Sequence, residues 1–130
     1  MEAAPTILVV EDEYFIAVAI EDALTDAGFE VVAVGSADEA ILLLKDALAF
    51  RALITDINGL GDIDGWEIAK RAREIDASLP VIYMTGAAAV DWSARGVPKS
   101  VLIPKPFAPA QIVTAVSQLL NGAGPSAGGP

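Results

Sequence analysis

The stretch Thr6-Ile7-Leu8-Val9-Val10-Glu11-Asp12-Glu13 decides the fold class, because it joins an apolar run to three consecutive acids. A run of β-branched residues and leucine predicts a strand that is covered on both faces, as strands of a parallel sheet are. The acids mark the carboxyl end of this strand. In open parallel sheets, ligands bind beyond the carboxyl ends of the strands. The stretch therefore predicts an α/β fold and also the edge of the sheet where a site should lie.

The rest of the chain alternates short apolar runs with helical patterns. Strands are predicted at residues 6–10, 30–34, 52–55, 80–84 and 100–103. Helices are predicted at residues 14–27, 36–48, 64–75 and 109–120. Between the last two strands, residues 86–98 encode at most a short helix, because Gly96 and Pro98 end the pattern soon after it begins. The alternation predicts a three-layer α/β sandwich, a five-stranded parallel sheet with helices on both faces and right-handed crossovers.

Composition narrows the possible functions. The 130 residues suffice for one domain, with 8 basic and 18 acidic side chains and a formal charge of −10. This charge argues against nucleic acid and against anionic membrane surfaces as partners. The chain has no cysteine and no histidine, which excludes disulfides, thiolate or imidazole metal ligands and serine–histidine triads. Any chemistry must use carboxylates, hydroxyls, lysines and backbone groups.

No stretch approaches the roughly 20 apolar residues of a membrane-spanning helix, and the first residues do not resemble a signal peptide. We therefore expect a cytoplasmic domain over residues 1–121. The remaining residues, 122–130, are rich in glycine and proline and are expected to form a disordered tail.

Four predicted strands end in side chains that carry chemistry. These are Glu11 and Asp12 after the first strand, Asp56 after the third, Thr85 after the fourth and Lys105 after the fifth. Carboxylates that meet at one edge repel one another unless a cation lies among them. Oxygen ligands without histidine or cysteine favour Mg²⁺. The sequence thus predicts a Mg²⁺ site at this edge.

The reaction that suits this set is in-line phosphoryl transfer to a carboxylate, which depends on positioning and charge neutralisation rather than on a histidine base. Asp56 is the predicted acceptor because its strand is central. Glu11, Asp12 and Asp56 would bind the metal together with the backbone carbonyl of Asn58, while Thr85 and Lys105 would bind phosphoryl oxygens. Each residue also has an ordinary structural interpretation as a helix cap, turn residue or surface lysine. Their common position at one sheet edge favours the functional interpretation.

These residues resemble the receiver domain of bacterial two-component response regulators. The resemblance extends from Thr6 to about Leu120 and rests on the opening strand with its acids, on Asp56, on Met84-Thr85-Gly86 and on Lys105-Pro106-Phe107. It implies a flavodoxin-like fold with strand order 2-1-3-4-5. It also implies Mg²⁺-dependent phosphorylation of Asp56 by a sensor histidine kinase or a histidine phosphotransfer protein, action on a downstream protein target, and a cis Lys105–Pro106 peptide.

The chain departs from the usual receiver pattern in three places. Leu102 stands three positions before the lysine, where receivers usually carry an aromatic switch residue. The loop over residues 56–65 is one residue longer than usual. Residues 86–98 encode the expected helix poorly. Tyr83-Met84-Thr85-Gly86 resembles the Phe-Ala-Thr-Gly signature of a variant subgroup that also lacks the switch aromatic, although the aromatic expected next is missing from residues 87–89.

Three functions compete at this point. The first is a phosphorylatable switch that catalyses its own phosphorylation and dephosphorylation and is not a turnover enzyme. The second is an unphosphorylated receiver-like module that only binds proteins, for which acids that repel one another would serve no purpose. The third is an enzyme on the same architecture. Flavodoxin and nucleotide folds need a glycine- or hydroxyl-rich phosphate loop after the first strand, and dehalogenase-type phosphatases need an aspartate where Asn58 stands.

Overall fold

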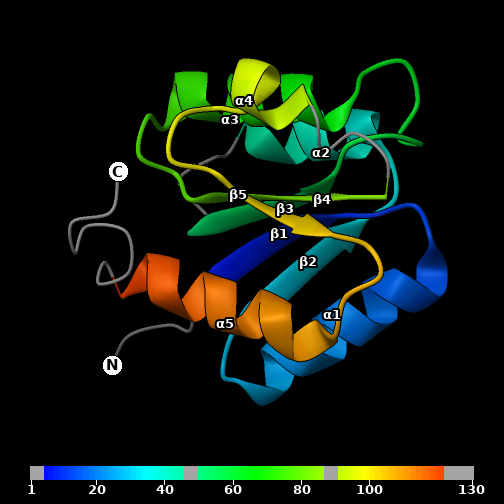
Figure 1. Ribbon diagram of the computed structural model, residues 1–130, viewed down its shortest axis with the longest axis vertical. Coiled ribbons are helices and arrows are strands. Elements are labelled where there is room, and N and C mark those ends of the chain that lie inside the picture. Colours follow the sequence, from blue (N-terminus) through cyan, green and yellow to red (C-terminus); the bar gives the residue numbers. More distant parts are fainter. Residues whose placement is uncertain (1–4, 46–49, 87–90, 122–130) are drawn as a thin grey trace.

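The computed structural model describes residues 5–45, 50–86 and 91–121, which form a five-stranded parallel sheet with helices on both faces (Figure 1). The strands lie in the order β2-β1-β3-β4-β5, which confirms the predicted topology. In chain order the elements are β1 (Thr6–Val10), α1 (Tyr14–Asp26), β2 (Glu30–Val34), α2 (Ala37–Leu44), β3 (Ala52–Asp56), α3 (Gly65–Ile75), β4 (Val81–Thr85), α4 (Trp92–Arg95), β5 (Val101–Pro104) and α5 (Pro109–Leu120).

The sheet separates two apolar cores. Helices α1 and α5 cover one face, and α2, α3 and α4 cover the other (Figure 1). Alternate residues of β1 belong to different cores, since Ile7 packs towards α1 and α5 whereas Leu8 packs towards α2 and α3. Both side chains are fully buried. This explains why β1 reads as an unbroken apolar run rather than as an alternating one.

Two strands begin and end one residue later than the sequence predicts. The fourth was expected over residues 80–84 and the fifth over residues 100–103. Pro80 has no N–H to give to the ladder, although its carbonyl still accepts the N–H of Leu53 at 3.0 Å. At the other end the ladder continues, because the Lys105 N–H donates to the Thr85 carbonyl at 2.7 Å. Thr85 is therefore the last residue of β4 rather than the first after it.

Two helices begin with a side-chain cap. The Ser36 hydroxyl accepts the Glu39 N–H at 3.3 Å before α2, and the Asp64 carboxylate accepts the Glu67 N–H at 3.0 Å before α3. The carboxylates three residues on have other partners: Glu39 accepts from the Gly35 N–H, and Glu67 pairs with Arg71 along the helix. The caps fix where both helices start.

Helix α4 spans only Trp92–Arg95, as the weak pattern there predicts. The described part of α2 ends at Leu44, because residues 46–49, over which the helix was expected to continue to about residue 48, lie outside the described residues. The expected disordered tail at residues 122–130 also lies outside them.

Candidate functional site

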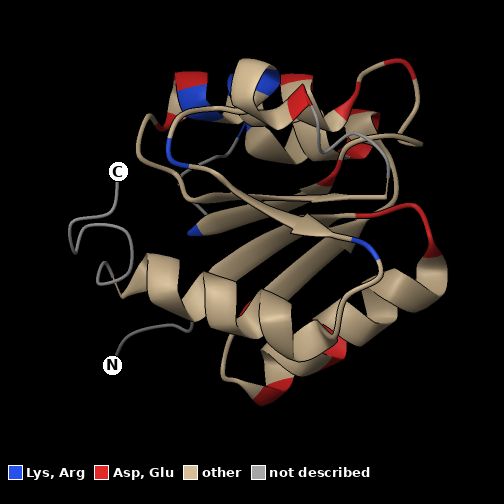
Figure 2. Ribbon diagram, in the orientation of Figure 1, with Lys and Arg blue, Asp and Glu red and all other residues tan. Residues whose placement is uncertain are grey.

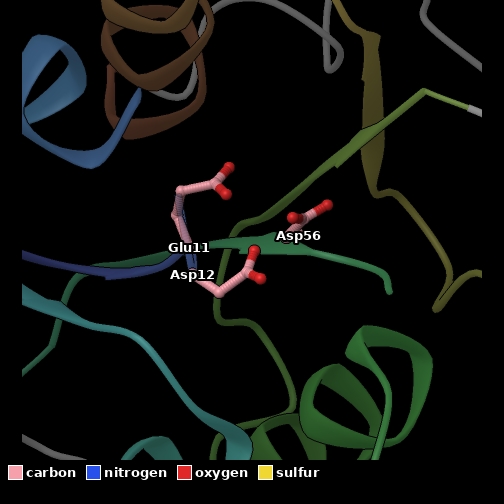
Figure 3. A group of neighbouring side chains, drawn as sticks. All are labelled: Glu11, Asp12 and Asp56. Atoms are coloured by element: carbon pink, nitrogen blue, oxygen red, sulfur yellow. The ribbon is translucent and has the colours of Figure 1, made fainter. Parts of the chain in front are cut away.

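Three carboxylates meet at the carboxyl edge of the sheet. One oxygen each from Glu11, Asp12 and Asp56 lies within 4.8 Å of the others (Figure 3). The register of the sheet produces this meeting, because β1 and β3 are neighbours and Val10 stands opposite Thr55. The residues that follow this pair are therefore brought side by side. Glu11 and Asp56 are buried, whereas Asp12 is exposed.

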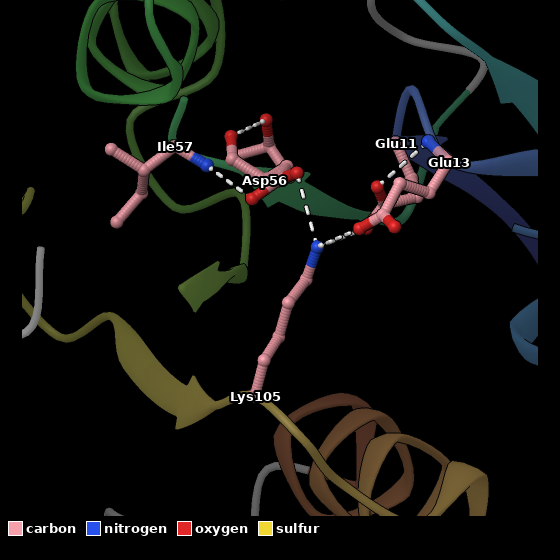
Figure 4. A network of polar contacts seen from close by, with 6 residues as sticks. Glu11, Glu13, Asp56, Ile57 and Lys105 are labelled. Atoms are coloured by element: carbon pink, nitrogen blue, oxygen red, sulfur yellow. Dashed lines mark hydrogen bonds and ion pairs between the residues drawn. The ribbon is translucent and has the colours of Figure 1, made fainter. Parts of the chain in front are cut away.

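The Lys105 ammonium lies among these acids (Figure 4). Its Nζ is 2.8 Å from Glu11 Oε1, 3.2 Å from Asp56 Oδ2 and 3.6 Å from Glu13 Oε1. Lys105 directly follows β5, and its peptide with Pro106 is cis, as the resemblance implied. The side chain reaches the acids across the intervening strand β4. One cation thus balances part of the charge of three acids.

Backbone hydrogen bonds orient the carboxylates. The Ile57 N–H donates to Asp56 Oδ1 at 3.0 Å, and the Glu13 N–H donates to Glu11 Oε2 at 3.0 Å. The Thr55 hydroxyl donates to the Asp56 carbonyl at 2.7 Å. Asp56 therefore has a fixed backbone and one carboxylate oxygen engaged by an amide, while its other oxygen faces Lys105.

Burial and the neighbouring charges shift the pKa values of two residues at the site. Burial raises the pKa of the Glu11 carboxyl above its ordinary value, and the nearby charge of Asp56 raises it further. Burial by itself lowers the pKa of the Lys105 ammonium. The contacts with Glu11 and Asp56 outweigh that effect, so that the pKa of Lys105 is raised overall. Lys105 is accordingly held in its charged form.

The donor set fits Mg²⁺. All three acids offer hard oxygen ligands, and the chain has no histidine or cysteine. Glu11 Oε1 is buried, and the partner that the structure describes for it is the Lys105 ammonium 2.8 Å away. A buried carboxylate oxygen in this state is a favourable ligand for a cation.

Two glycines allow the loop after β3 to approach the acids. A Cβ on Gly59 would lie 3.1 Å from Asp12 Oδ2, and Gly59 has a φ of +85°. A Cβ on Gly65 would lie 2.1 Å from the Asp56 carbonyl oxygen, which no rearrangement of a side chain can relieve. The Gly65 N–H in turn donates to the Ile57 carbonyl at 2.8 Å. These glycines place the loop against Asp12 and Asp56.

The remaining predicted residues also lie at this edge. Thr85 is 2% exposed at the end of β4, next to Pro104 of β5 in the ladder. Asn58 is exposed in the loop after Asp56, two residues from the acceptor in sequence. Their assigned contacts with a phosphoryl group and a metal stay predictions.

Sequence reasoning missed three features of the site. Glu13 forms an ion pair with Lys105, and the lack of a side chain on Gly65 lets it lie against the carbonyl of Asp56. A cavity of about 530 Å³ opens beside Lys105 and is lined mainly by apolar residues, among them Phe15 of α1 and Phe107 after β5. The unbroken acid triplet could have suggested the role of Glu13, but the cavity arises from residues far apart in the sequence.

Comparison with known proteins identifies the family. The family described as response regulator receiver domain matches residues 7–117, and the chain belongs to that family. Receiver domains are signalling switches of two-component systems, and they interact with histidine kinases.

Particular relatives make the similarity concrete. The chain is 32% identical over 116 residues to the response regulator receiver protein CpdR of Brucella abortus, covering 88% of this chain and 95% of that protein. It is 30% identical over 115 residues to the C4-dicarboxylate transport transcriptional regulatory protein DctD of Rhizobium meliloti. That match covers 87% of this chain and 25% of DctD, so the chain spans about a quarter of that relative's length.

Among solved structures, a response regulator receiver protein from Sinorhizobium medicae WSM419 is 48% identical to the chain, with a TM-score of 0.88. The match covers 92% of this chain and 97% of that protein. Among the helices within residues 5–45, 50–86 and 91–121, none has the length and apolar character needed to cross a bilayer.

Proposed function

We propose that this chain is a phosphoryl-accepting switch in which Asp56 receives a phosphoryl group in a Mg²⁺-dependent reaction. The observation that carries the proposal is the Lys105 ammonium held 3.2 Å from Asp56 Oδ2, inside a cluster of three acids that offers only oxygen ligands. A scaffold that binds proteins without being phosphorylated would gain no stability from burying Glu11 and Asp56 together.

The proposed donor is a phosphohistidine on a sensor histidine kinase or histidine phosphotransfer protein. An oxygen of the Asp56 carboxylate attacks the phosphorus, an O–P bond forms and the P–N bond breaks. The imidazole leaves with the electron pair of that bond and takes up a proton. Hydrolysis later transfers the phosphoryl group to water and restores the carboxylate. Because the group stays on the protein between these steps, the chain is not a turnover enzyme in this proposal.

Each residue has a defined part. Glu11, Asp12, Asp56 and the carbonyl of Asn58 would hold Mg²⁺, which supplies positive charge to the phosphoryl oxygens during transfer. The Lys105 ammonium is already at the acceptor and neutralises another oxygen. The Thr85 hydroxyl, at the adjacent strand end, donates to a third. The Ile57 N–H keeps one oxygen of Asp56 engaged, which orients the carboxylate for in-line attack.

The surface next to Asp56 suits a protein donor. Phe15 is 85% exposed at the start of α1, and the cavity that it lines with Phe107 also reaches Lys105. Exposed apolar surface of this kind marks interaction sites in soluble proteins. A donor that covered it would bring its phosphohistidine to the acceptor edge and exclude water from the reaction. The downstream partner is proposed to be a protein as well.

Incubation with radiolabelled acetyl phosphate tests the proposal without a kinase. We expect the wild-type chain to become labelled in the presence of Mg²⁺ and to remain unlabelled when the metal is chelated. Asp56→Asn should abolish labelling. Asp62→Asn is the matched control, because it removes the same charge from an exposed position of the same loop, and it should label normally. An Asp56→Asn variant that labels as well as the wild type overturns the proposal.

A further inference from the structure

The residues that follow α4 are tied to β4 by one buried side chain. The Val97 N–H donates to the Tyr83 hydroxyl at 3.0 Å. Tyr83 itself is fully buried in β4. Burial raises the pKa of this hydroxyl, so it remains a neutral phenol under ordinary conditions. A backbone amide of an irregular segment is thus bound to the interior of the sheet rather than to solvent.

The ring of Tyr83 is fixed by its neighbours. It packs against Trp66 of α3 at a centroid distance of 4.8 Å and an interplanar angle of 58°. Trp66 is 4% exposed, and the Arg95 guanidinium of α4 lies 5.7 Å from its ring centroid. Tyr83 cannot move along its strand direction without disturbing this stack, because close-packed rings leave little free space.

Three further polar side-chain contacts hold the same segment. The Ser100 hydroxyl, just before β5, donates to the Val97 carbonyl at 2.7 Å, and the other two contacts come from α3 or its cap. Arg73 of α3 donates from Nη1 to the Pro98 carbonyl at 2.7 Å. Arg95 lies 3.4 Å from Asp64, the N-cap residue of α3. Among the contacts that the structure describes for residues 95–98, the bond from Val97 to Tyr83 is therefore the side-chain tie that leads directly into β4.

Tyr83 and Thr85 are connected by the geometry of the strand. They stand two positions apart in β4, so their side chains leave the same face of the sheet. Across the sheet, Tyr83 is opposite Leu102 of β5, whose side chain has no polar atom that could bind the Val97 amide. The direct side-chain route from the end of β4 to Val97 therefore runs through Tyr83. The route through β5 is longer, because it passes along that strand to the Ser100 hydroxyl before it reaches the Val97 carbonyl.

We propose that Tyr83 is a positioning residue that transmits a change at the Thr85 end of β4 to residues 95–98. Phosphorylation of Asp56 then alters the surface formed by α4 and the residues after it. The proposal rests on the proposed function, since it needs a phosphoryl group at Asp56. It assigns the coupling to a hydroxyl-to-backbone hydrogen bond and to the stack with Trp66.

Amide NMR of the full chain tests this role, with Mg²⁺ and beryllium fluoride as the phosphoryl mimic. In the wild type we expect shifts at the Ile57 and Lys105 amides, which report binding, and at the Val97 amide and the Trp92 indole N–H, which report the distant change. Tyr83→Phe keeps the ring but removes the hydroxyl. It should retain the first pair of shifts and lose the second. Tyr14→Phe, the matched control at a 73% exposed tyrosine, should retain both.

The outcomes separate the two proposals. If the wild type shows no shift at Ile57 and Lys105, the mimic does not bind, and the proposed function fails together with this inference. If those amides shift but Tyr83→Phe retains the full response at Val97 and Trp92, only the role of Tyr83 is overturned. Hydrogen exchange of the Val97 amide in the unaltered chain gives a second readout that does not depend on the variant folding. A change in its exchange rate on adding the mimic supports the role, and an unchanged rate contradicts it.

Discussion

Two regions of the molecule are held by different interactions. One is the carboxyl edge of the sheet, which carries Asp56, and the other is the connection between α4 and β5, residues 95–98, which includes Val97. At the edge, one ammonium lies beside the buried carboxylates of Glu11 and Asp56 and the exposed carboxylate of Glu13. At the connection, Arg73 and Tyr83 hold backbone groups by hydrogen bonds that no strand register provides. Figure 2 shows acidic positions in the segment that follows β1 and a basic position in the segment that follows β5. The edge is therefore held by charge, whereas residues 95–98 are held by hydrogen bonds to neighbouring elements.

The largest effect is expected from Gly65→Ala, which disrupts the edge alone. The new Cβ would lie 2.1 Å from the Asp56 carbonyl oxygen, so the backbone of the acceptor must move. We expect a loss of about 3 kcal/mol in the free energy of unfolding, the upper range for overpacking a closed site. Mg²⁺ binding, measured by calorimetry, should be lost as well.

Gly35→Ala is the control for that variant. It lies at the same edge, and its Cβ would meet Glu11 and Asp12 backbone atoms at 3.8 and 3.9 Å, which is ordinary van der Waals contact. Denaturant unfolding and Mg²⁺ affinity should stay close to those of the wild type. Equal losses of stability and Mg²⁺ affinity in both variants would mean that the structure of this sheet edge does not depend on the close contact between Gly65 and the Asp56 carbonyl.

A smaller effect is expected from Lys105→Met. The substitution removes the counter-charge of Glu11, whose side chain is fully buried, while the aliphatic part of the side chain is kept. Without Mg²⁺ we expect the free energy of unfolding of the variant to fall by about 2 kcal/mol. The loss is smaller than for a fully buried ion pair, because Lys105 is 16% exposed. Mg²⁺ should restore more stability to this variant than to the wild type, since it supplies positive charge to the same acids.

Thermal unfolding with and without Mg²⁺ measures this difference. Lys70→Met is the control, because it makes the same change at an exposed position of α3. It should respond to Mg²⁺ as the wild type does. If Mg²⁺ stabilises Lys105→Met no more than Lys70→Met, the acids are not the place where the cation acts.

The smallest of these effects is expected from Arg73→Met, which affects only the connection. Arg73 donates to the Leu79 carbonyl at 2.6 Å and to the Pro98 carbonyl at 2.7 Å. Its removal should lower the free energy of unfolding by about 1 kcal/mol, because the Pro98 carbonyl lies at an exposed position and can bind water instead. Acetyl phosphate labelling and Mg²⁺ affinity should be unchanged, and Arg51→Met at an exposed position should change neither stability nor labelling. Weaker Mg²⁺ binding by Arg73→Met would show that the two regions are not separable.

The edge could be predicted from the sequence because simple rules determine it. Apolar runs locate parallel strands, and parallel strands bring their carboxyl ends together, so Glu11, Asp12, Asp56 and Lys105 meet as expected. The short α4 was also predicted, since Gly96 and Pro98 cannot continue a helix. Predictions of this kind require only the identity of a few residues that are neighbours in the sequence.

The connection could not be predicted in the same way. The tie from Tyr83 to Val97 joins residues 14 apart in sequence, and Arg73 reaches Pro98 over a separation of 25. Nothing in the local pattern marks Trp66 as the ring on which Tyr83 packs. Likewise, Gly65 reads as an ordinary residue after a helix cap until its distance from the Asp56 carbonyl is known. Such contacts depend on how the elements pack rather than on their own sequence.

The central claim is that the carboxyl group of Asp56 carries the phosphoryl group. Borohydride reduces an acyl phosphate to an alcohol, which converts a phosphorylated aspartate to homoserine while free carboxylates do not react. Treating the chain with acetyl phosphate, Mg²⁺ and then borohydride, followed by peptide mass spectrometry, should place homoserine at position 56. Homoserine at Asp12 or another aspartate, or its absence from a chain that has been labelled, would contradict the account.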